Sequence, residues 1–156
     1  MPIEKRVAQL LTAQKKTLSI AESCSGGLLC HRLTNIPGSS HFLKLGLIAY
    51  SNDAKIKFLK IPLQILNKHG AVSQPAARQM AKNVRKFLQT DFGVGITGIA
   101  GPGGGSAVKP VGLTFIALST KKKVVCRKFI FKGNRLSIKS QAANQALEIL
   151  GKCLEV

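Results

Sequence analysis

Hydrophobic positions along the chain recur at two alternating periods, which predict helices and strands in turn. Ile3, Val7, Leu10 and Leu11 fall at helical spacing, and the apolar run at 17–21 that follows is typical of a short buried strand. The whole pattern predicts the order α, β, α, β, α, α, β, β, β, α. The expected helices cover 3–15, 28–34, 51–60, 73–89 and a segment that begins near 134, and the expected strands cover 17–21, 42–50, 91–99, 111–120 and 124–131.

This order of elements favours one fold class. Helices between strands act as crossovers and cover the faces of a sheet. The last two strands are separated only by the run Lys121 to Lys123, which predicts a hairpin with a solvated turn. The length of 156 residues fits one ordinary domain, and the chain has no internal repeat and no linker. We therefore expect a single α/β domain over 1–156, with a mixed sheet covered by helices.

Charge changes the picture more than any other feature of composition. Lys and Arg total 24 against six acidic residues, which gives a formal net charge of +18. Such an excess favours an anionic partner: a nucleotide, a nucleic acid or a membrane surface. Aromatic residues make up only 5% of the chain, which disfavours a single-strand nucleic-acid binder, because such proteins stack bases on aromatic rings.

Metal and membrane chemistry find little support in the sequence. The cysteines, Cys24, Cys30, Cys126 and Cys153, form no CxxC pair, and six acids are too few for a carboxylate metal site. The start of the chain has no uninterrupted apolar segment, and no run approaches the ~20 residues of a membrane span. We expect a cytoplasmic, reduced protein with no metal and no membrane partner.

One loop that could carry chemistry is Glu22 to Gly27, between the first predicted strand and the next helix. In open α/β sheets, ligands bind beyond the carboxyl ends of strands, where a turn can aim free N–H groups at a developing oxyanion. Ser23 is placed there to act as a nucleophile. The alternative is that Ser23 or Ser25 only caps the helix and that Gly26 and Gly27 only allow tight packing.

A second loop, Tyr50 to Lys55, follows the second predicted strand. Lys55 falls in the first turn of the next helix, from where it can reach back over the sheet edge as the base for a serine. A lysine base needs its pKa lowered from ~10.4 by burial or by cationic neighbours, and Lys57 and Lys60 are such neighbours. The alternatives are a solvated charge for Lys55 and a core position for Tyr50, in place of a phenolic hydrogen bond near the site.

The third loop runs from Gly95 to Ser106, and seven of its twelve residues are Gly or Pro. Glycines let a backbone approach a ligand closely and present its N–H groups. The spacing matches neither a P-loop nor a dinucleotide-binding fingerprint. A mobile surface loop has the same composition, so both interpretations stay open. No histidine has a triad partner, which leaves Ser–Lys chemistry as the economical arrangement for a hydrolase.

Six short motifs occur together in this chain. They are Ala21–Gly27 (AESCSGG), Pro37–Ser40 (PGSS), Ala49–Lys55 (AYSNDAK), His69–Ser73 (HGAVS), Ile96–Pro102 (ITGIAGP) and Lys109–Gly112 (KPVG). In order and spacing they resemble the CinA C-terminal domain family, the bacterial nicotinamide-nucleotide amidohydrolases or NMN deamidases. The resemblance implies a three-layer α/β/α sandwich with a mixed, mostly parallel five-stranded sheet. It also implies a stand-alone form, without the molybdopterin-binding-like domain that precedes this one in many relatives.

The resemblance also implies an activity: hydrolysis of the carboxamide of nicotinamide mononucleotide to nicotinate mononucleotide and ammonia, with no metal or other cofactor. Ser23 is then the expected nucleophile and Lys55 its general base, with Tyr50 nearby. Backbone N–H groups around Cys24 to Gly26 are expected to hold the oxyanion. The expected substrate-binding residues are Ser25, Gly26, Gly27, Thr97, Gly98 and Arg135.

Arg135 is expected near the phosphate or the pyridine-carboxamide end of the substrate. This chain departs from the family pattern around it, because Asn134 stands where relatives often have Asp. Basic residues of the next turn are also partly replaced, which leaves Lys139 and Ser140. Ser25, commonly Thr in relatives, keeps a hydroxyl.

Two other functions stay open from the sequence. One is a catalytically silent CinA-like binding module. The other is a basic nucleic-acid-binding accessory protein, which would use the helix face formed by Arg78, Lys82, Arg85 and Lys86. For the amidohydrolase, we expect nicotinamide mononucleotide as the small-molecule partner, a homo-oligomer, and no nucleic acid.

Overall fold

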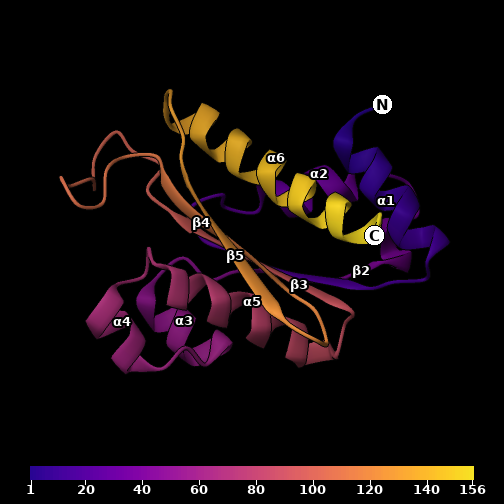
Figure 1. Ribbon diagram of the computed structural model, residues 1–156, viewed down its shortest axis with the longest axis horizontal. Helices are drawn as coiled ribbons and strands as arrows, with labels where there is room; N and C mark the ends of the chain where they lie inside the picture. The colour runs from indigo at the N-terminus through magenta and orange to yellow at the C-terminus, as the bar shows by residue number, and fades with distance from the viewer.

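A five-stranded sheet lies between two layers of helices in the computed structural model, which describes residues 1–156 (Figure 1). The helices are α1 (Ile3–Ala13), α2 (Leu28–Thr34), α3 (Asn52–Leu59), α4 (Leu63–His69), α5 (Gln74–Leu88) and α6 (Arg135–Leu154), with a 3-10 turn η1 (Ser39–His41). The strands are β1 (Leu18–Glu22), β2 (Leu43–Ile48), β3 (Phe92–Gly98), β4 (Leu113–Ser119) and β5 (Val124–Ile130).

The strands are arranged in the order β2-β1-β3-β4-β5. β1 pairs in parallel with both β2 and β3, whereas β4 is antiparallel to β3 and to β5, so four of the five strands point the same way. The chain passes from β1 to β2 on one side and then returns to β3 on the other. This reversal leaves a crevice beyond the carboxyl ends of β1 and β3, where ligands bind in open α/β sheets. The expected fold class is confirmed.

The two helical layers follow from the direction of these crossovers. α1, α2 and α6 cover one face of the sheet, and α3, α4 and α5 cover the other (Figure 1). On the first face Ile138, Ala142 and Ala146 of α6 are buried in the main hydrophobic core. On the second face α5 lies so close to β3 that a Cβ at Gly93 would stand 2.2 Å from the Ala81 carbonyl oxygen. Glycine in β3 therefore permits this contact.

The hydrophobic pattern misses one helix and places most strand ends one or two residues away from the observed ends. It predicts a turn at Gly70 and no helix between Lys60 and Gly70, but α4 occupies most of this segment. The helix has fewer than two full turns and only Leu66 is buried, so it shows no helical periodicity. β1 extends one residue further than predicted, to Glu22, and β2 ends two residues earlier, at Ile48. Both shifts bear directly on the site.

Three further structural findings concern the cysteines, possible metal ligands and possible membrane spans. The four cysteines are free thiols. No group of three or more His, Cys, Asp or Glu side chains lies together as metal ligands would. None of the helices combines the length and the apolar character that a bilayer crossing requires.

Candidate active site

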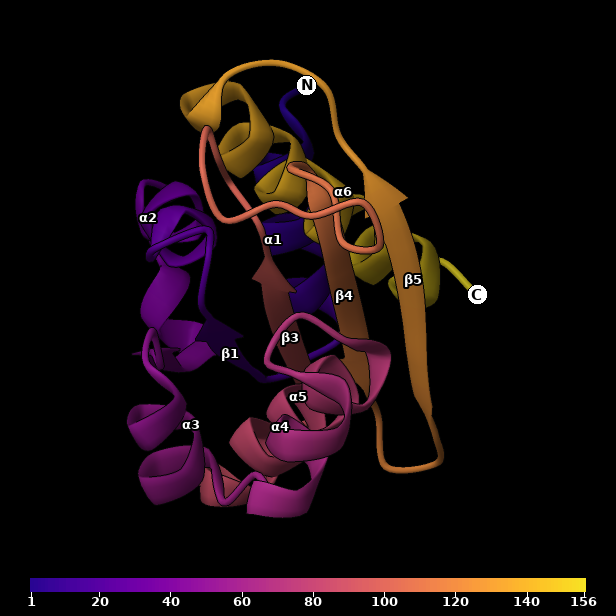
Figure 2. The same cartoon turned by 90° about the vertical axis from the view of Figure 1, so that its left-hand side faces the viewer.

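A cavity of about 200 Å³ lies beyond the carboxyl ends of β1 and β3. Figure 2 shows β3 pointing toward the end of the molecule at which α6 begins. Five separate segments contribute to the wall. The lining residues are Ser23, Cys24, Tyr50, Lys55, Ala71, Val72, Thr97, Gly98, Ala100 and Arg135. The cavity thus brings together the three predicted catalytic residues and three of the six predicted substrate-binding residues.

Ser23 and Lys55 are in direct contact at this cavity. The Lys55 Nζ lies 2.9 Å from the Ser23 Oγ, 2.8 Å from the Ala49 carbonyl oxygen and 2.9 Å from the Tyr50 carbonyl oxygen. Both carbonyls are available because β2 ends at Ile48: the Ala49 N–H still donates to Glu22 of β1, but the carbonyl oxygens of the two residues after the strand accept no bond from the sheet. A neutral amine has two N–H groups and one lone pair. When the two carbonyls take the N–H groups, the lone pair is left for the Ser23 hydroxyl.

Local sequence explains how Lys55 reaches this position. Ser51 caps α3, its hydroxyl oxygen accepting from the Ala54 N–H at 3.0 Å, so the helix begins directly after β2. Lys55 therefore lies in the first turn, as predicted, and its side chain points back over the sheet. The residue is only 1% exposed. The alternative of a solvated charge is wrong.

Burial also sets the protonation of Lys55. Loss of hydration lowers the pKa of the Lys55 ammonium to about 8, against a slight opposing effect of Cys24. The predicted contribution of Lys57 and Lys60 is wrong, since both are exposed and neither affects this pKa. An amine with this pKa is neutral in about one molecule in ten at pH 7, whereas an ordinary lysine is almost fully charged.

The turn between β1 and α2 is fixed by Glu22. Its carboxylate is fully buried and accepts from the Leu29 and Cys30 N–H groups, each at 3.1 Å, at the start of α2. The last residue of β1 is in this way tied to the first turn of the helix, across the five residues between them. Glu22 was not among the residues predicted to act at the site. The signal for it was an acid within the motif that precedes a helix lacking a side-chain cap of its own.

Hydrogen bonds within this turn decide which N–H groups remain for a ligand. Ser23 donates its N–H to Ile96, and Gly26 donates to the Ser23 carbonyl oxygen at 3.1 Å. The N–H groups of Cys24 and Ser25 have no acceptor in the protein. Of the expected oxyanion donors, Cys24 and Ser25 are therefore free and Gly26 is already engaged.

Glu22 offers a test of how this turn is held. Replacing Glu22 by Ala leaves two buried N–H groups without a partner, so we expect the free energy of unfolding to fall by about 2–3 kcal/mol in urea titrations. Glu148→Ala is the matched control, because Glu148 makes no hydrogen bond or ion pair; a loss within about 0.5 kcal/mol is expected there. Equal losses in the two variants would contradict this role for Glu22.

Tyr50 and Arg135 lie together at the edge of the cavity. The Arg135 guanidinium donates to the Gly101 carbonyl oxygen at 2.7 Å and to the Tyr50 hydroxyl at 3.2 Å. The Tyr50 side chain is 60% exposed, so its assignment to the core is wrong. Thr97 is buried, and its hydroxyl donates to the Ala71 carbonyl oxygen at 2.8 Å, which holds the opposite wall in place.

The other predicted binding residues lie apart from the cavity lining. Ser25 is fully buried, and its hydroxyl is the one buried side-chain polar atom without a hydrogen-bond partner. Gly26 and Gly27 form the outer part of the turn with positive φ angles, which glycine adopts readily. From the glycine-rich segment after β3, only Ala100 lines the cavity.

Two residues of the cavity lining, Ala71 and Val72, were not among the predicted site residues. They lie between α4 and α5, within the motif His69–Ser73. The motif was visible in the sequence, but small apolar side chains carry no chemical signal by themselves. Lys109, which follows the glycine-rich loop, donates to the His69 carbonyl oxygen and so anchors that loop to the same segment.

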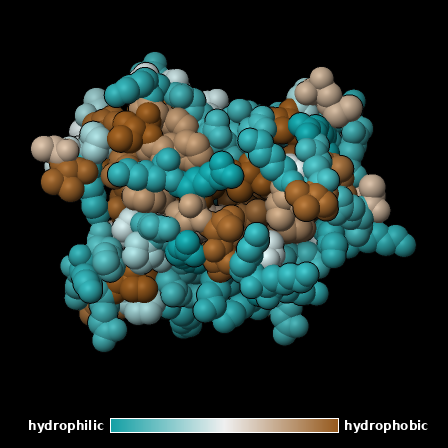
Figure 3. All heavy atoms as spheres, in the orientation of Figure 1, coloured by the Kyte–Doolittle hydropathy of each residue, from teal (hydrophilic) through white to brown (hydrophobic).

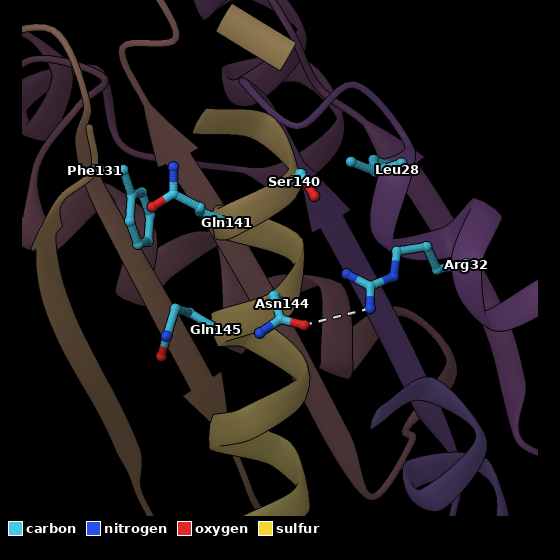
Figure 4. A pocket seen from close by; sticks show the side chains of 7 residues that line it. All are labelled: Leu28, Arg32, Phe131, Ser140, Gln141, Asn144 and Gln145. Atoms are coloured by element: carbon cyan, nitrogen blue, oxygen red, sulfur yellow. Dashed lines mark hydrogen bonds between the residues drawn. The ribbon is translucent and has the colours of Figure 1, made fainter. Parts of the chain in front are cut away.

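Other cavities contain no buried base in contact with a hydroxyl. One of about 330 Å³ lies between α2 and α6 and is lined mainly by polar side chains (Figure 4). Its cation, Arg32, is paired with Glu4 at 2.9 Å and donates to Asn144, so its charge is already neutralised. Another, of about 650 Å³, lies beside β5 and the end of α6. The cavity at Ser23 is the one that joins a buried base to a hydroxyl.

The basic excess forms no free patch on α5. Of the four residues on its basic face, Arg78 donates to the Val124 carbonyl oxygen and Arg85 donates to Ser119 and Thr90, so both guanidinium groups are engaged at the sheet. Hydrophilic side chains cover most of the face in Figure 3, and hydrophobic ones lie among them in separate patches. The feature on which the nucleic-acid alternative depended is thus reduced to Lys82 and Lys86.

Comparison with known proteins agrees with this architecture. The family model for the CinA C-terminal domain matches residues 1–154. A competence-damage inducible protein of Caldicellulosiruptor bescii is 49% identical over 150 residues, and a CinA-like protein of Syntrophus aciditrophicus is 49% identical over 153. These matches cover 96% and 97% of this chain, which spans 36% of the length of each of the two relatives.

Solved structures resemble the chain over nearly its whole length. The crystal structure of the competence/damage inducible protein CihA from Agrobacterium tumefaciens has a TM-score of 0.95 and 38% identity, with 99% of this chain and 94% of that chain covered. A CinA superfamily protein from Klebsiella pneumoniae has a TM-score of 0.94 and 29% identity, with 98% and 96% covered.

Proposed function

Because this chain belongs to the CinA C-terminal domain family, we propose that it hydrolyses the carboxamide of nicotinamide mononucleotide to nicotinate mononucleotide and ammonia. The observation that carries the proposal is the contact between Ser23 and Lys55. A buried amine with a lowered pKa contacts two carbonyl oxygens and, at 2.9 Å, the serine hydroxyl. In its neutral form the two N–H groups bind the carbonyls and the lone pair faces the hydroxyl. This is the arrangement that activates a serine nucleophile without histidine.

The reaction follows from these positions. Neutral Lys55 takes the Ser23 proton as the Oγ bonds to the carboxamide carbon, and the carbonyl electron pair moves to its oxygen. The free N–H groups of Cys24 and Ser25 are the donors for that oxyanion. The Lys55 ammonium then protonates the leaving nitrogen, and ammonia departs to leave an ester on Ser23. Water, deprotonated by Lys55, cleaves the ester and restores the serine.

Cys24 is the competing nucleophile in this cavity, and its surroundings disfavour it. Burial raises the pKa of the Cys24 thiol to about 11, although the charges of Lys55 and Lys139 oppose the rise. The thiol is therefore protonated at neutral pH, and a protonated thiol is a much weaker nucleophile than a thiolate. Its sulfur packs against Gly98, where a Cβ would lie 3.1 Å from it.

The pKa of Lys55 predicts the pH dependence. Only the neutral amine can act as the base, so kcat/KM should rise about tenfold per pH unit below pH 8 and level off above about pH 9. The apparent pKa should be about 8 when initial rates are measured at constant ionic strength. Lys57→Met, which removes an exposed cation nearby, should leave this apparent pKa unchanged. A rate that is flat between pH 6 and pH 9 would rule out Lys55 as the base.

The function itself is tested with purified protein and nicotinamide mononucleotide. Ammonia and nicotinate mononucleotide should form in equal amounts, and prior treatment with EDTA should not alter the rate. Hydroxylamine should divert part of the product to the hydroxamate, because it attacks the ester on Ser23 in place of water. A catalytically silent module would instead bind the nucleotide and release no ammonia, and that outcome would overturn the proposal.

A further inference from the structure

The part of the cavity wall formed by Ala71 and Val72 belongs to a short connection between two helices. α4 ends at His69 and α5 begins at Gln74, so the connection consists of the four residues between them. Both lining residues are half-buried, and Val72 makes no hydrogen bond of its own. Small apolar side chains cannot fix a backbone through directed bonds. The position of this wall therefore depends on what holds the residues around it.

Two hydrogen bonds join this connection to segments elsewhere in the chain. The Ala71 carbonyl oxygen accepts from the Thr97 hydroxyl of β3 at 2.8 Å, and the His69 carbonyl oxygen accepts from the Lys109 ammonium. A third bond, from the Ser73 hydroxyl, stays within the connection and attaches it to nothing else. Lys109 is thus one of two side chains that hold the wall from outside.

Lys109 is itself held at a fixed place. Its N–H donates to the Ser106 hydroxyl at 3.0 Å and its carbonyl oxygen accepts from the Ser106 N–H at 2.8 Å, just before β4 begins at Leu113. The side chain is half-buried and forms no ion pair. Its Nζ lies 2.9 Å from the position that a Cβ would take at Gly70. A lysine placed in this way binds the last carbonyls of a helix, here α4.

Lys109 acts on the cavity only through the wall. It is not among the lining residues, so its ammonium does not touch a group bound beside Ser23. The other end of the glycine-rich loop is fixed as well, because Arg135 donates to the Gly101 carbonyl oxygen at 2.7 Å. The loop is therefore anchored at both ends, and its second anchor is the bond that reaches the helix connection.

We propose that Lys109 is a positioning residue for the reaction at Ser23, and that its bond to the His69 carbonyl oxygen holds Ala71 and Val72 against the bound carboxamide. This inference rests on the proposed function. A wall in its proper place confines the carboxamide within reach of the Ser23 Oγ. A displacement of about 1 Å, even from a change outside the reacting groups, can reduce the rate about 10²-fold.

The first test measures the kinetics of Lys109→Met with nicotinamide mononucleotide. We expect kcat to fall about 10- to 100-fold while KM stays within about threefold, because the substrate still binds but is poorly aligned. The apparent pKa of about 8 should not change, since Lys109 does not act on the pKa of Lys55. A raised KM with unchanged kcat would mean that Lys109 binds the substrate itself, and a shifted pKa that it acts by charge; either result overturns the proposal.

Lys68→Met is the matched control. Lys68 precedes His69, is exposed, and makes no hydrogen bond or ion pair, so its loss removes a cation from the same helix end without removing a bond. Both kinetic constants should stay within about twofold of the wild-type values. Lys109→Arg keeps an N–H donor for the carbonyl and should bring kcat back to within about threefold. Equal losses in Lys68→Met and Lys109→Met would contradict the positioning role.

Hydrogen exchange in the free protein examines the wall without the reaction. The Gly70 N–H donates to the Leu66 carbonyl oxygen at 2.9 Å. In Lys109→Met it should exchange about tenfold faster, because the end of α4 is no longer tied to the loop. Exchange in β3 and the midpoint of urea unfolding should match those of Lys68→Met. Unchanged exchange at Gly70 would overturn the inference, whereas failure of the proposed function would appear as no ammonia release by the wild-type protein.

Discussion

Ser23→Ala should abolish ammonia release from nicotinamide mononucleotide, with kcat reduced by about 10⁵-fold or more. In the proposed reaction the Oγ is the atom that bonds to the carboxamide carbon, and no other hydroxyl lies within hydrogen-bond distance of the Lys55 amine. The variant should fold normally, because the change removes one oxygen from a residue that also forms a backbone bond to Ile96. A coupled ammonia assay and a urea titration on the same preparation measure both properties.

Cys24→Ala provides the matched control for this prediction. It truncates the neighbouring residue of the same turn, leaves the free N–H groups in place, and should keep kcat within about tenfold of the wild-type value. The margin allows for a small cavity beside Gly98, against which the sulfur packs. An active Ser23→Ala protein with an inactive Cys24→Ala protein would transfer the nucleophile to the thiol.

Lys55→Met should lower kcat by about 10³-fold or more, since a general base contributes about 10²–10⁴ and this one also serves as the acid for the leaving group. Methionine has a similar length and no charge, so the fold should survive. Lys55→Arg is the more specific test, because it separates the charge of Lys55 from its action as a base. It keeps a cation beside Ser23 but cannot give up its proton near neutral pH, and should be as inactive as Lys55→Met. Substantial activity in Lys55→Arg would mean that Lys55 acts through its charge alone.

Burial of Lys55 also makes the stability of the fold depend on pH. The pKa of Lys55 is lower in the folded protein than in the unfolded chain, so the folded protein binds fewer protons between about pH 8 and the ordinary value of 10.5. Stability contributed by this group is therefore lowest below pH 8 and increases as the pH rises through that interval. Burial of Lys55 thus lowers the free energy of unfolding at neutral pH, and it also lowers the pKa of the amine.

Much of the site was accessible from local sequence. Ser23 follows a buried strand, Lys55 lies in the first turn of a helix that Ser51 caps, and both facts come from patterns within about ten residues. That a Ser–Lys pair was the available chemistry followed from six acidic residues and no histidine with a partner. These inferences needed only composition, periodicity and capping preferences.

The remaining features depend on segments far apart in the sequence. Ser23 and Lys55 are 32 residues apart, and their 2.9 Å contact exists because β1 and β2 pair in parallel and end side by side. Local patterns could not show that Lys57 and Lys60 are exposed to solvent. They also could not show that the Gly26 N–H is bonded within its own turn, or that Ala71 lines the cavity. Strand ends shift by one or two residues without altering hydrophobic periodicity, although such shifts decide which carbonyls are free.

The sequence by itself determined the fold class and the order of every element except α4, and it singled out Ser23 and Lys55 as candidates, because these inferences depend on period, composition and neighbours along the chain. Only the tertiary structure decided the state of those side chains. Hydration, and with it the pKa of Lys55, depends on what packs around the amine, and the N–H groups that bind Glu22 come from another element, α2.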